Sequence, residues 1–212
     1  MSFLFLGGFI PFLLMHSNVQ ELRNDPRLDE RVQKFLDSRA GRWRDMNIPS
    51  RDGKFLHDLI LNHKYTRALE IGTSTGHSGI WIAWALSKTG GKLTTIEIDE
   101  QRYRAALENF KEAGLTDFID ARLADAHLLV PKLEGAFDFV FSDADKEWYT
   151  NYFVAVAPKM TIGGCFTAHN VTMRTRGIRE FVEHVKNLPN FETTIEQRAT
   201  TGISVSYKRA ER

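Results

Sequence analysis

Two apolar runs in this sequence each end in polar residues that could do chemistry. The run FVFSDADK leads to Asp143, Asp145 and Lys146, and the run CFTAHN leads to His169 and Asn170. Carboxylate, imidazole and amide groups bind divalent cations, and imidazole also transfers protons near neutral pH. A solvated group of ion pairs explains the first run equally well, and packing on an apolar strand explains the histidine.

A glycine-containing segment, EIGTSTGHS, leads from another apolar run toward a helix. Gly72 and Gly76 allow a tight turn and let a ligand approach the main chain, and the helix that follows offers free N–H groups. The spacing G-x-x-x-G is neither the dinucleotide fingerprint nor a phosphate-binding P-loop. Taken alone, the segment is also compatible with an ordinary strand-to-helix turn.

An acid at the end of the next apolar run narrows the class of ligand. Glu97 in TTIEIDE lies about 20 residues after Gly76, the distance at which a carboxylate accepts hydrogen bonds from ribose hydroxyls. Asp99 is better placed to cap the following helix. A glycine loop and a ribose acid together indicate an adenosine-containing ligand. Because the loop lacks a phosphate cradle, S-adenosylmethionine is favoured over a dinucleotide.

The elements that must position these residues alternate between strands and helices. Apolar residues at helical spacing predict an amphipathic helix over residues 25–44, and Ser50 is the expected N-cap of a second helix. The strands expected after these helices cover residues 68–71, 93–98, 118–123, 137–142, 164–168, 191–196 and 203–207. The helices expected between them cover residues 77–86, 100–113, 126–133 (a turn or a helix), 148–157 and 175–186.

This alternation predicts an α/β fold with a mostly parallel sheet, helices on both faces and an antiparallel pair of strands at one edge. In such a sheet the carboxyl ends of the parallel strands meet along one side, where ligands bind. We therefore expect the polar strand tips to come together.

The length and composition of the chain limit the number of domains and the kinds of partner. A chain of 212 residues has room for one well-buried α/β domain, and 42% hydrophobic residues with 26% charged ones are typical of a folded protein. A net charge of +1 gives no field for binding nucleic acid, which is not expected as a partner. The single Cys165 excludes an intramolecular disulfide and fits a reducing compartment.

The N-terminal residues 1–17 form an apolar segment ahead of the expected domain, residues 18–212. The run FLFLGGFIPFLLM over residues 3–15 is too short to span a bilayer as a helix and lacks the flanks of a signal peptide. Three interpretations stay open: an extension upstream of a true start at Met15, a signal or membrane-tether segment, and an apolar arm packed on a subunit. We expect a cytoplasmic protein, with export or membrane tethering through this run as the alternative.

Four motifs in this order resemble a known family. EIGTSTGHS, TIEIDE, FDFVFSDADKEWYTNY and GGCFTAHN are closely similar to the metal-dependent class I O-methyltransferases of the caffeoyl-CoA and catechol type, over roughly residues 42–208. The resemblance implies a Rossmann-like seven-stranded methyltransferase fold, S-adenosylmethionine as methyl donor and a homodimer. It also implies a divalent cation that chelates a small phenolic acceptor.

The resemblance assigns roles to residues of this chain. It implies that Asp143 touches both cation and cofactor, that Lys146 is the general base, and that His127 lies with its neighbours beside the adenine. The expected catalytic residues are Lys146, Asp143 and His169. The expected cofactor-binding residues are Met46, Asn47, Ile48, Glu70, Gly72, Ser74, Ser78, Glu97, Ile98, Asp125, Ala126 and Asp143.

The chain departs from the family pattern at His169. The family has Asp-Asn there, so the implied cation ligands become Asp143, His169 and Asn170. One carboxylate fewer weakens a site for Mg²⁺ and favours softer ions such as Mn²⁺ or Zn²⁺. Three interpretations of His169 stay open: a ligand for a softer ion, a general base in a site without metal, and a structural or inactive replacement.

The expected function is S-adenosylmethionine-dependent O-methylation of a small phenolic or catechol-like hydroxyl, assisted by a divalent metal. The alternatives are a non-catalytic S-adenosylmethionine-binding module and a metal-independent methyltransferase that uses His169 as base. A nicotinamide-dependent oxidoreductase is disfavoured because Thr73 and Ser74 replace the expected glycine spacing.

Overall fold

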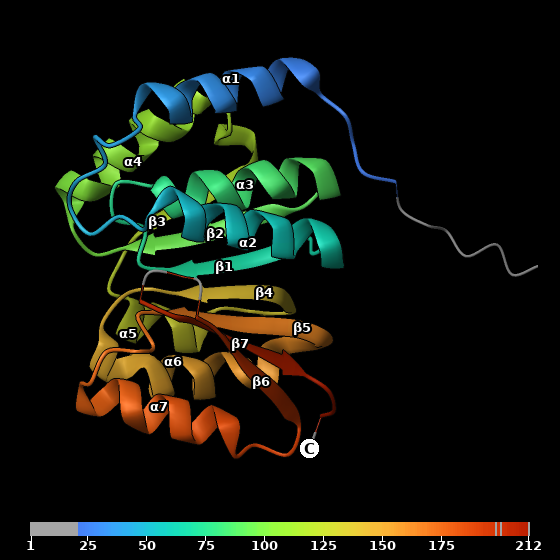
Figure 1. Cartoon of the computed structure of the whole chain (residues 1–212), viewed down its shortest axis with the longest axis vertical. Helices are drawn as coiled ribbons and strands as arrows, with labels where there is room; N and C mark the ends of the chain where they lie inside the picture. The colour runs from blue at the N-terminus through green and yellow to red at the C-terminus, as the bar shows by residue number, and fades with distance from the viewer. Residues whose placement is uncertain (1–20, 198, 200, 212) are drawn as a thin grey trace, which may run out of the picture.

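The computed structural model of this chain describes residues 21–197, 199 and 201–211 (Figure 1). The predicted N-terminal segment, residues 1–17, lies outside the described residues. Among the helices that are described, none has both the length and the apolar composition needed to cross a bilayer. The helices are α1 (Pro26–Ser38), α2 (Ser50–His63), α3 (His77–Thr89), α4 (Glu100–Ala113), α5 (Ala126–Leu129), α6 (Tyr149–Val156) and α7 (Arg176–Lys186). The strands are β1 (Arg67–Ile71), β2 (Lys92–Glu97), β3 (Ile119–Leu123), β4 (Phe137–Ser142), β5 (Met160–His169), β6 (Phe191–Glu196) and β7 (Ile203–Lys208).

The seven strands form one sheet in the order β3-β2-β1-β4-β5-β7-β6. The first five are parallel, and β7 pairs antiparallel with both β5 and β6. The predicted mostly parallel sheet with an antiparallel edge pair is confirmed. Because the strand order reverses between β1 and β4, the crevice for a ligand is expected at their carboxyl ends.

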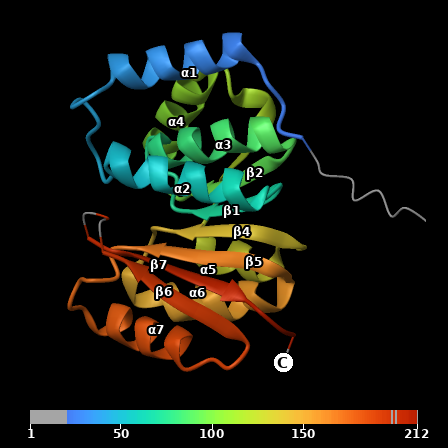
Figure 2. The same cartoon turned by 45° about the vertical axis from the view of Figure 1, so that its right-hand side comes forward.

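Helices cover both faces of the sheet, with α1–α4 on one and α5–α7 on the other (Figures 1 and 2). Side chains along each strand point alternately to the two faces of the sheet, so each face has its own hydrophobic core. In β4, Phe139 and Phe141 face the first helix layer and Val140 faces the second. These strand residues are fully buried, as expected for a sheet covered on both faces.

Some boundaries differ from those predicted. α1 ends at Ser38 and is therefore shorter than the predicted span of residues 25–44. Gly41 follows soon after with a φ of +69°, a left-handed conformation that does not continue a helix. Ser50 is the first helical residue of α2 and not its N-cap, since Pro49 occupies that position. β5 extends beyond residues 164–168 through an irregular, exposed stretch around Gly163, where the apolar pattern is interrupted.

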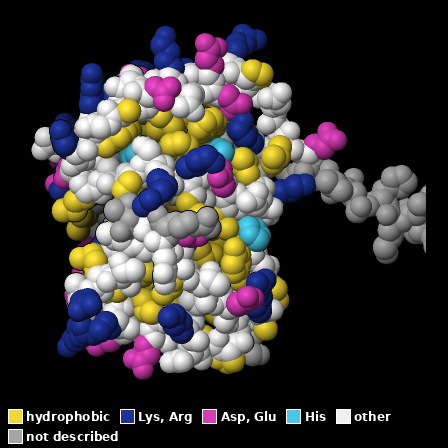
Figure 3. All heavy atoms as spheres, in the orientation of Figure 1, with side chains coloured by type: hydrophobic (Ala, Val, Ile, Leu, Met, Phe, Trp, Pro, Cys, Tyr) yellow, Lys and Arg dark blue, Asp and Glu magenta, His cyan; other side chains and the backbone are white. Residues whose placement is uncertain are grey.

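Charges of both signs are mixed on the face shown in Figure 3. Lys and Arg side chains alternate there with Asp and Glu side chains, and apolar side chains lie between them. This face therefore presents no single-sign field of the kind that attracts a polyanion.

Candidate functional site

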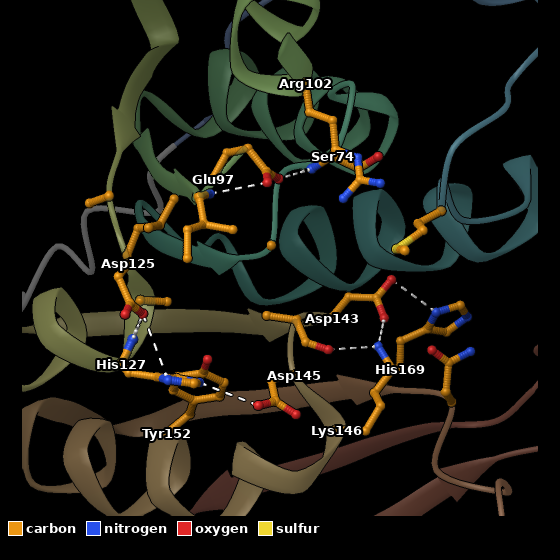
Figure 4. Close-up of a pocket in the computed structure, with 18 of the residues that line it drawn as sticks. Ser74, Glu97, Arg102, Asp125, His127, Asp143, Asp145, Lys146, Tyr152 and His169 are labelled. Carbon is orange, nitrogen blue, oxygen red and sulfur yellow. Dashed lines mark hydrogen bonds and ion pairs between the residues drawn. The ribbon is translucent and has the colours of Figure 1, made fainter. Parts of the chain in front are cut away.

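A cavity of about 800 Å³ lies at the carboxyl ends of β1, β2, β4 and β5. Most of the predicted site residues line it from different sides (Figure 4). The predicted residues that line the cavity are Met46, Asn47, Gly72, Ser74, Glu97, Ile98, Asp125, Ala126, Asp143, Lys146, His169 and Asn170. Its size is that of a site for a cofactor-sized molecule.

Glu97 anchors one part of the cavity. Its Oε2 accepts a hydrogen bond from the Ser74 N–H at 2.7 Å, and its Oε1 accepts from the N–H groups of Ile98 and Asp99 at 3.0 Å each. Three main-chain donors hold this buried carboxylate in one orientation at the tip of β2. A carboxylate fixed this way can accept further hydrogen bonds from a pair of vicinal hydroxyls. Asp99 caps α4 through a bond from the Arg102 N–H, as predicted.

A second part of the cavity is aromatic. The His127 ring stacks on Trp148 with ring centroids 3.9 Å apart, and its Nε2 lies 3.4 Å from the Asp145 carboxylate. Asp125 caps α5 by accepting a bond from the His127 N–H at 2.9 Å. Tyr152 completes this side of the cavity. Flat, partly apolar walls with polar edges suit a planar heterocycle.

The third part holds the groups that could do chemistry. Lys146 donates to Oδ1 of Asp143 at 2.6 Å, and Nδ1 of His169 lies 3.2 Å from Oδ2 of the same carboxylate. Figure 4 shows Asp143 between these two side chains. The polar ends of the FVFSDADK and CFTAHN runs therefore meet in the cavity, as expected for neighbouring parallel strands.

A residue that the sequence did not single out completes this group. Nε2 of His169 lies 3.0 Å from Oδ2 of Asp52, in the first turn of α2. Burial alone would lower the pKa of His169, but hydrogen bonds and charge from Asp143 and Asp52 outweigh burial and raise that pKa to about 9. The imidazole lies between two carboxylates, which favour its protonated form.

The donor set does not fit the divalent cation that the resemblance implies. A metal-bound imidazole offers a lone pair on one ring nitrogen, and here each ring nitrogen of His169 faces a carboxylate oxygen. Because Asp52 and Asp143 contact different nitrogens, they cannot share one ion with the ring. Asn170 donates from its amide nitrogen to the Thr201 hydroxyl at 2.6 Å, a bond that does not involve Oδ1, the amide atom that binds cations. Across the described residues, no group of three or more His, Cys, Asp or Glu side chains is arranged to hold a metal ion.

Three predicted cofactor residues lie behind the cavity wall. Ile48 is buried and its carbonyl contacts the His77 ring, Ser78 is buried at the start of α3, and Glu70 is fully buried in β1. Burial raises the pKa of Glu70 to about 8, and its Oε2 accepts a bond from the Thr95 hydroxyl at 2.5 Å. The structure does not place these three on the surface of the cavity, and their part in cofactor binding stays a prediction.

Several residues of the wall were not predicted from the sequence, and three of them have large side chains. Arg102, Tyr152 and Met173 all line the cavity. Tyr152 lies inside the SDADKEWYTNY block, so its place in that motif was a usable signal. Arg102 and Met173 belong to no motif, and nothing in their spacing pointed to the site.

Comparisons with known proteins agree with this geometry. The pattern that describes the O-methyltransferase family matches residues 17–190. A catechol O-methyltransferase of Niastella koreensis is 38% identical over 130 residues, 59% of this chain. A caffeoyl-CoA O-methyltransferase of Eucalyptus globulus is 30% identical over 156 residues, 71% of this chain. These matches span 58% and 63% of the two relatives' own lengths.

Solved structures share the fold over most of the chain. An O-methyltransferase of Streptomyces achromogenes involved in tomaymycin synthesis, solved in complex with SAM, has a TM-score of 0.71 at 25% identity, covering 89% of this chain and 92% of that one. An O-methyltransferase of Bacillus cereus in complex with SAH has a TM-score of 0.69 at 27% identity, covering 88% and 92%. From the family match over most of its length and the fold that it shares with these structures, the chain belongs to the O-methyltransferase family.

Proposed function

We propose that this chain transfers a methyl group from S-adenosylmethionine to the hydroxyl of a small phenolic or catechol-like acceptor. The observation that carries this proposal is that Glu97 and the Asp143–Lys146 pair line different parts of the same cavity. Relatives named for catechol and caffeoyl-CoA O-methylation support the choice of acceptor.

The three parts of the cavity suit the three parts of the donor. The carboxylate of Glu97 accepts hydrogen bonds from the ribose hydroxyls, and the aromatic side around His127 and Tyr152 takes the adenine. Asp143 and the Gly72 turn then face the sulfonium and methionine end. This placement leaves Lys146 beside the reacting methyl group.

The reaction is an in-line displacement. A lone pair of the acceptor oxygen forms a bond to the methyl carbon, and the carbon–sulfur bond breaks with its electron pair left on sulfur, which becomes a neutral thioether. The hydroxyl proton passes to Lys146 in its neutral amine form, as the family resemblance implies. The main contribution of the protein is to align donor and acceptor at attacking distance.

Exposed apolar side chains at the cavity favour a flat aromatic acceptor. Met46 and Met173 line the cavity while remaining 77% and 42% exposed. Burying such side chains under a ligand is favourable at about 25 cal/mol per Å². A sugar or an amino acid would gain less from this wall than a phenol.

The test is a methyl-transfer assay over a panel of catechols and hydroxycinnamoyl thioesters, with and without Mg²⁺, Mn²⁺ and Zn²⁺. Lys146→Ala should lose most of the turnover while it keeps its affinity for S-adenosylmethionine, and Lys34→Ala on α1 is the matched control. A folded protein that binds the donor but methylates no acceptor would instead be a non-catalytic binding module. Calorimetric binding of NAD in place of S-adenosylmethionine would overturn both.

The homodimer implied by the resemblance is part of this proposal. Light scattering of the purified protein measures its mass directly. A mass equal to one chain at assay concentrations would remove the dimer from the proposed function.

A further inference from the structure

Asp52 is a deeply buried acid beside the proposed reaction site. Its side chain is 1% exposed, and its Oδ2 atom lies 3.0 Å from Nε2 of His169. A carboxylate is costly to bury unless charged or donating groups surround it, and the His169 ring is one such group. The contact with His169 therefore helps to stabilise Asp52 in its buried position.

The position of Asp52 follows from the packing of α2. Gly53, the next residue, lies so close to Trp81 of α3 that a Cβ atom would come within 2.1 Å of Cδ1 of that ring. This contact sets how closely the first turn of α2 packs on α3, and Asp52 in the same turn contacts His169 at the end of β5. Asp52 thus reaches His169 across 117 positions of sequence.

Asp52 does not line the cavity, whereas His169, Asp143 and Lys146 do. Its contact with His169 connects it to the cavity lining. The contacts continue from His169 Nδ1 to Asp143 Oδ2 at 3.2 Å, and from Asp143 Oδ1 to Lys146 Nζ at 2.6 Å. The four side chains form one chain of hydrogen bonds that ends at the proposed proton acceptor.

The backbone of His169 is held as well. The Tyr149 hydroxyl donates to the His169 carbonyl at 3.2 Å, and the Thr201 hydroxyl lies 3.4 Å from Nε2. With both ring nitrogens facing carboxylates and the main chain fixed, the imidazole has no free nitrogen to offer a cation. The ring occupies the place where the family resemblance implies a carboxylate ligand.

We infer that Asp52 is a positioning residue that holds the His169 ring against Asp143. We infer further that this chain uses the row of hydrogen bonds from Asp52 through His169 and Asp143 to Lys146, here called the relay, in place of a divalent cation. The inference rests on the proposed methyl transfer, which it deepens. Asp52 and His169 fix the Asp143 carboxylate, and Asp143 fixes Lys146, which takes the hydroxyl proton as the acceptor oxygen forms its bond to the methyl carbon. The relay is internal to the protein, so turnover does not depend on added metal.

The first experiment measures cation binding without any reaction. Mn²⁺ is titrated into wild-type protein and into His169→Asp, which restores the Asp-Asn pattern of the family, and free Mn²⁺ is followed by electron paramagnetic resonance. The variant should bind one Mn²⁺ at least ~10-fold more tightly than the wild type. Stoichiometric Mn²⁺ binding by the wild type, equal to that of the variant, would overturn the inference.

The second experiment tests the role of Asp52. In protein labelled with ¹⁵N-histidine, Asp52→Asn should shift the ring signals of His169, whereas Asp58→Asn, a matched change on the same helix, should not. Asp52→Asn should also lower kcat with the KM for S-adenosylmethionine unchanged, because Asp52 does not touch the cavity. A purely structural Asp52 would lower the melting temperature and leave both the His169 signals and kcat of the folded protein unchanged, which would refute the assignment.

A failure of the proposed function and a failure of this inference can be told apart. If Asp52→Asn does not fold, the wild-type histidine spectra and the Mn²⁺ titration still report whether the ring nitrogens face carboxylates or an ion. If the wild type methylates no acceptor, the proposed function fails, but the Mn²⁺ and histidine measurements still decide the arrangement of Asp52 and His169. If it does turn over, chelator treatment should leave the rate unchanged in the wild type and abolish it in an active His169→Asp protein.

Discussion

Arg102 of α4 and Asp45, which precedes the cavity residue Met46, form a two-point ion pair. Nε of Arg102 lies 2.8 Å from Oδ2 of Asp45, and Nη2 lies 2.7 Å from Oδ1. Asp45 and Met46 both have positive φ angles, +62° and +60°, which L-residues adopt only when their surroundings hold them. The pair therefore fastens a strained segment over the cavity, and Arg102 lowers the pKa of Asp45.

Arg102→Gln should loosen this segment. Because the paired side chains are 29% and 42% exposed, the loss is modest, and we expect the Kd for S-adenosylmethionine to rise by about 5-fold, mainly through faster dissociation. Stopped-flow binding measures both rates. Arg104→Gln, which removes an exposed pair with Glu100 on the same helix, is the control and should bind as the wild type does. Equal dissociation rates for the two variants would show that the ion pair does not hold the segment.

Glu97→Gln should weaken cofactor binding more strongly. Three N–H groups converge on the carboxylate, and an amide presents an NH₂ group to at least one of them, so the side chain must turn and lose its orientation. We expect the Kd for S-adenosylmethionine to rise by roughly 10- to 100-fold, measured by calorimetry. An unchanged Kd would mean that the ribose lies elsewhere.

Glu70 should make stability fall with rising pH. Burial raises its pKa from 4.5 to about 8 in the folded protein, so the folded state keeps a proton that the unfolded state releases. The free energy of unfolding contributed by this group decreases as pH rises from 4.5 to about 8. Urea unfolding at several pH values should show a shallower decrease for Glu70→Gln than for the wild type.

Glu108→Gln is the control for that measurement because Glu108 is exposed on α4. Its stability should follow the wild type at every pH. Parallel curves for wild type and Glu70→Gln would contradict a protonated Glu70 in the folded protein.

Gly72→Ala should destabilise the fold through two effects. Its φ of +99° is unfavourable for alanine, and a Cβ atom would lie 2.9 Å from the Asp143 backbone. Gly163 has a similar φ of +85° with no atom within 4 Å of such a Cβ, so Gly163→Ala isolates the backbone effect, worth about 1–2 kcal/mol. Gly72→Ala should cost at least ~1 kcal/mol more in the free energy of unfolding. Equal losses would mean that the β1 and β4 loops separate freely.

The sheet was the most predictable part of this protein. Apolar runs such as the one ending at Ser142 are buried on both faces, and their alternation with helices leaves few topologies open. Boundaries failed where the pattern was interrupted, as around Gly163 in β5, because exposure on both sides removes the apolar signal.

The residues at the strand tips were predictable for the same reason. Glu97, Asp143, Lys146 and His169 meet because parallel strands end on one side of the sheet, and the motifs marked those ends. Whether each side chain reaches the cavity was not predictable. Glu70 lies in a motif as clear as that of Glu97, yet it turns into the core, since the direction of a side chain at a strand end depends on the packing beside it.

The sequence by itself determined the order of elements, the family and the set of polar strand tips, because periodicity and motifs are local properties of the chain. Only the tertiary structure decided what His169 contacts. Asp52 belongs to no sequence motif. It contacts His169 because the absence of a side chain at Gly53 lets α2 pack closely on Trp81. A contact of this kind depends on how two distant elements pack, and no local pattern in the chain encodes that distance.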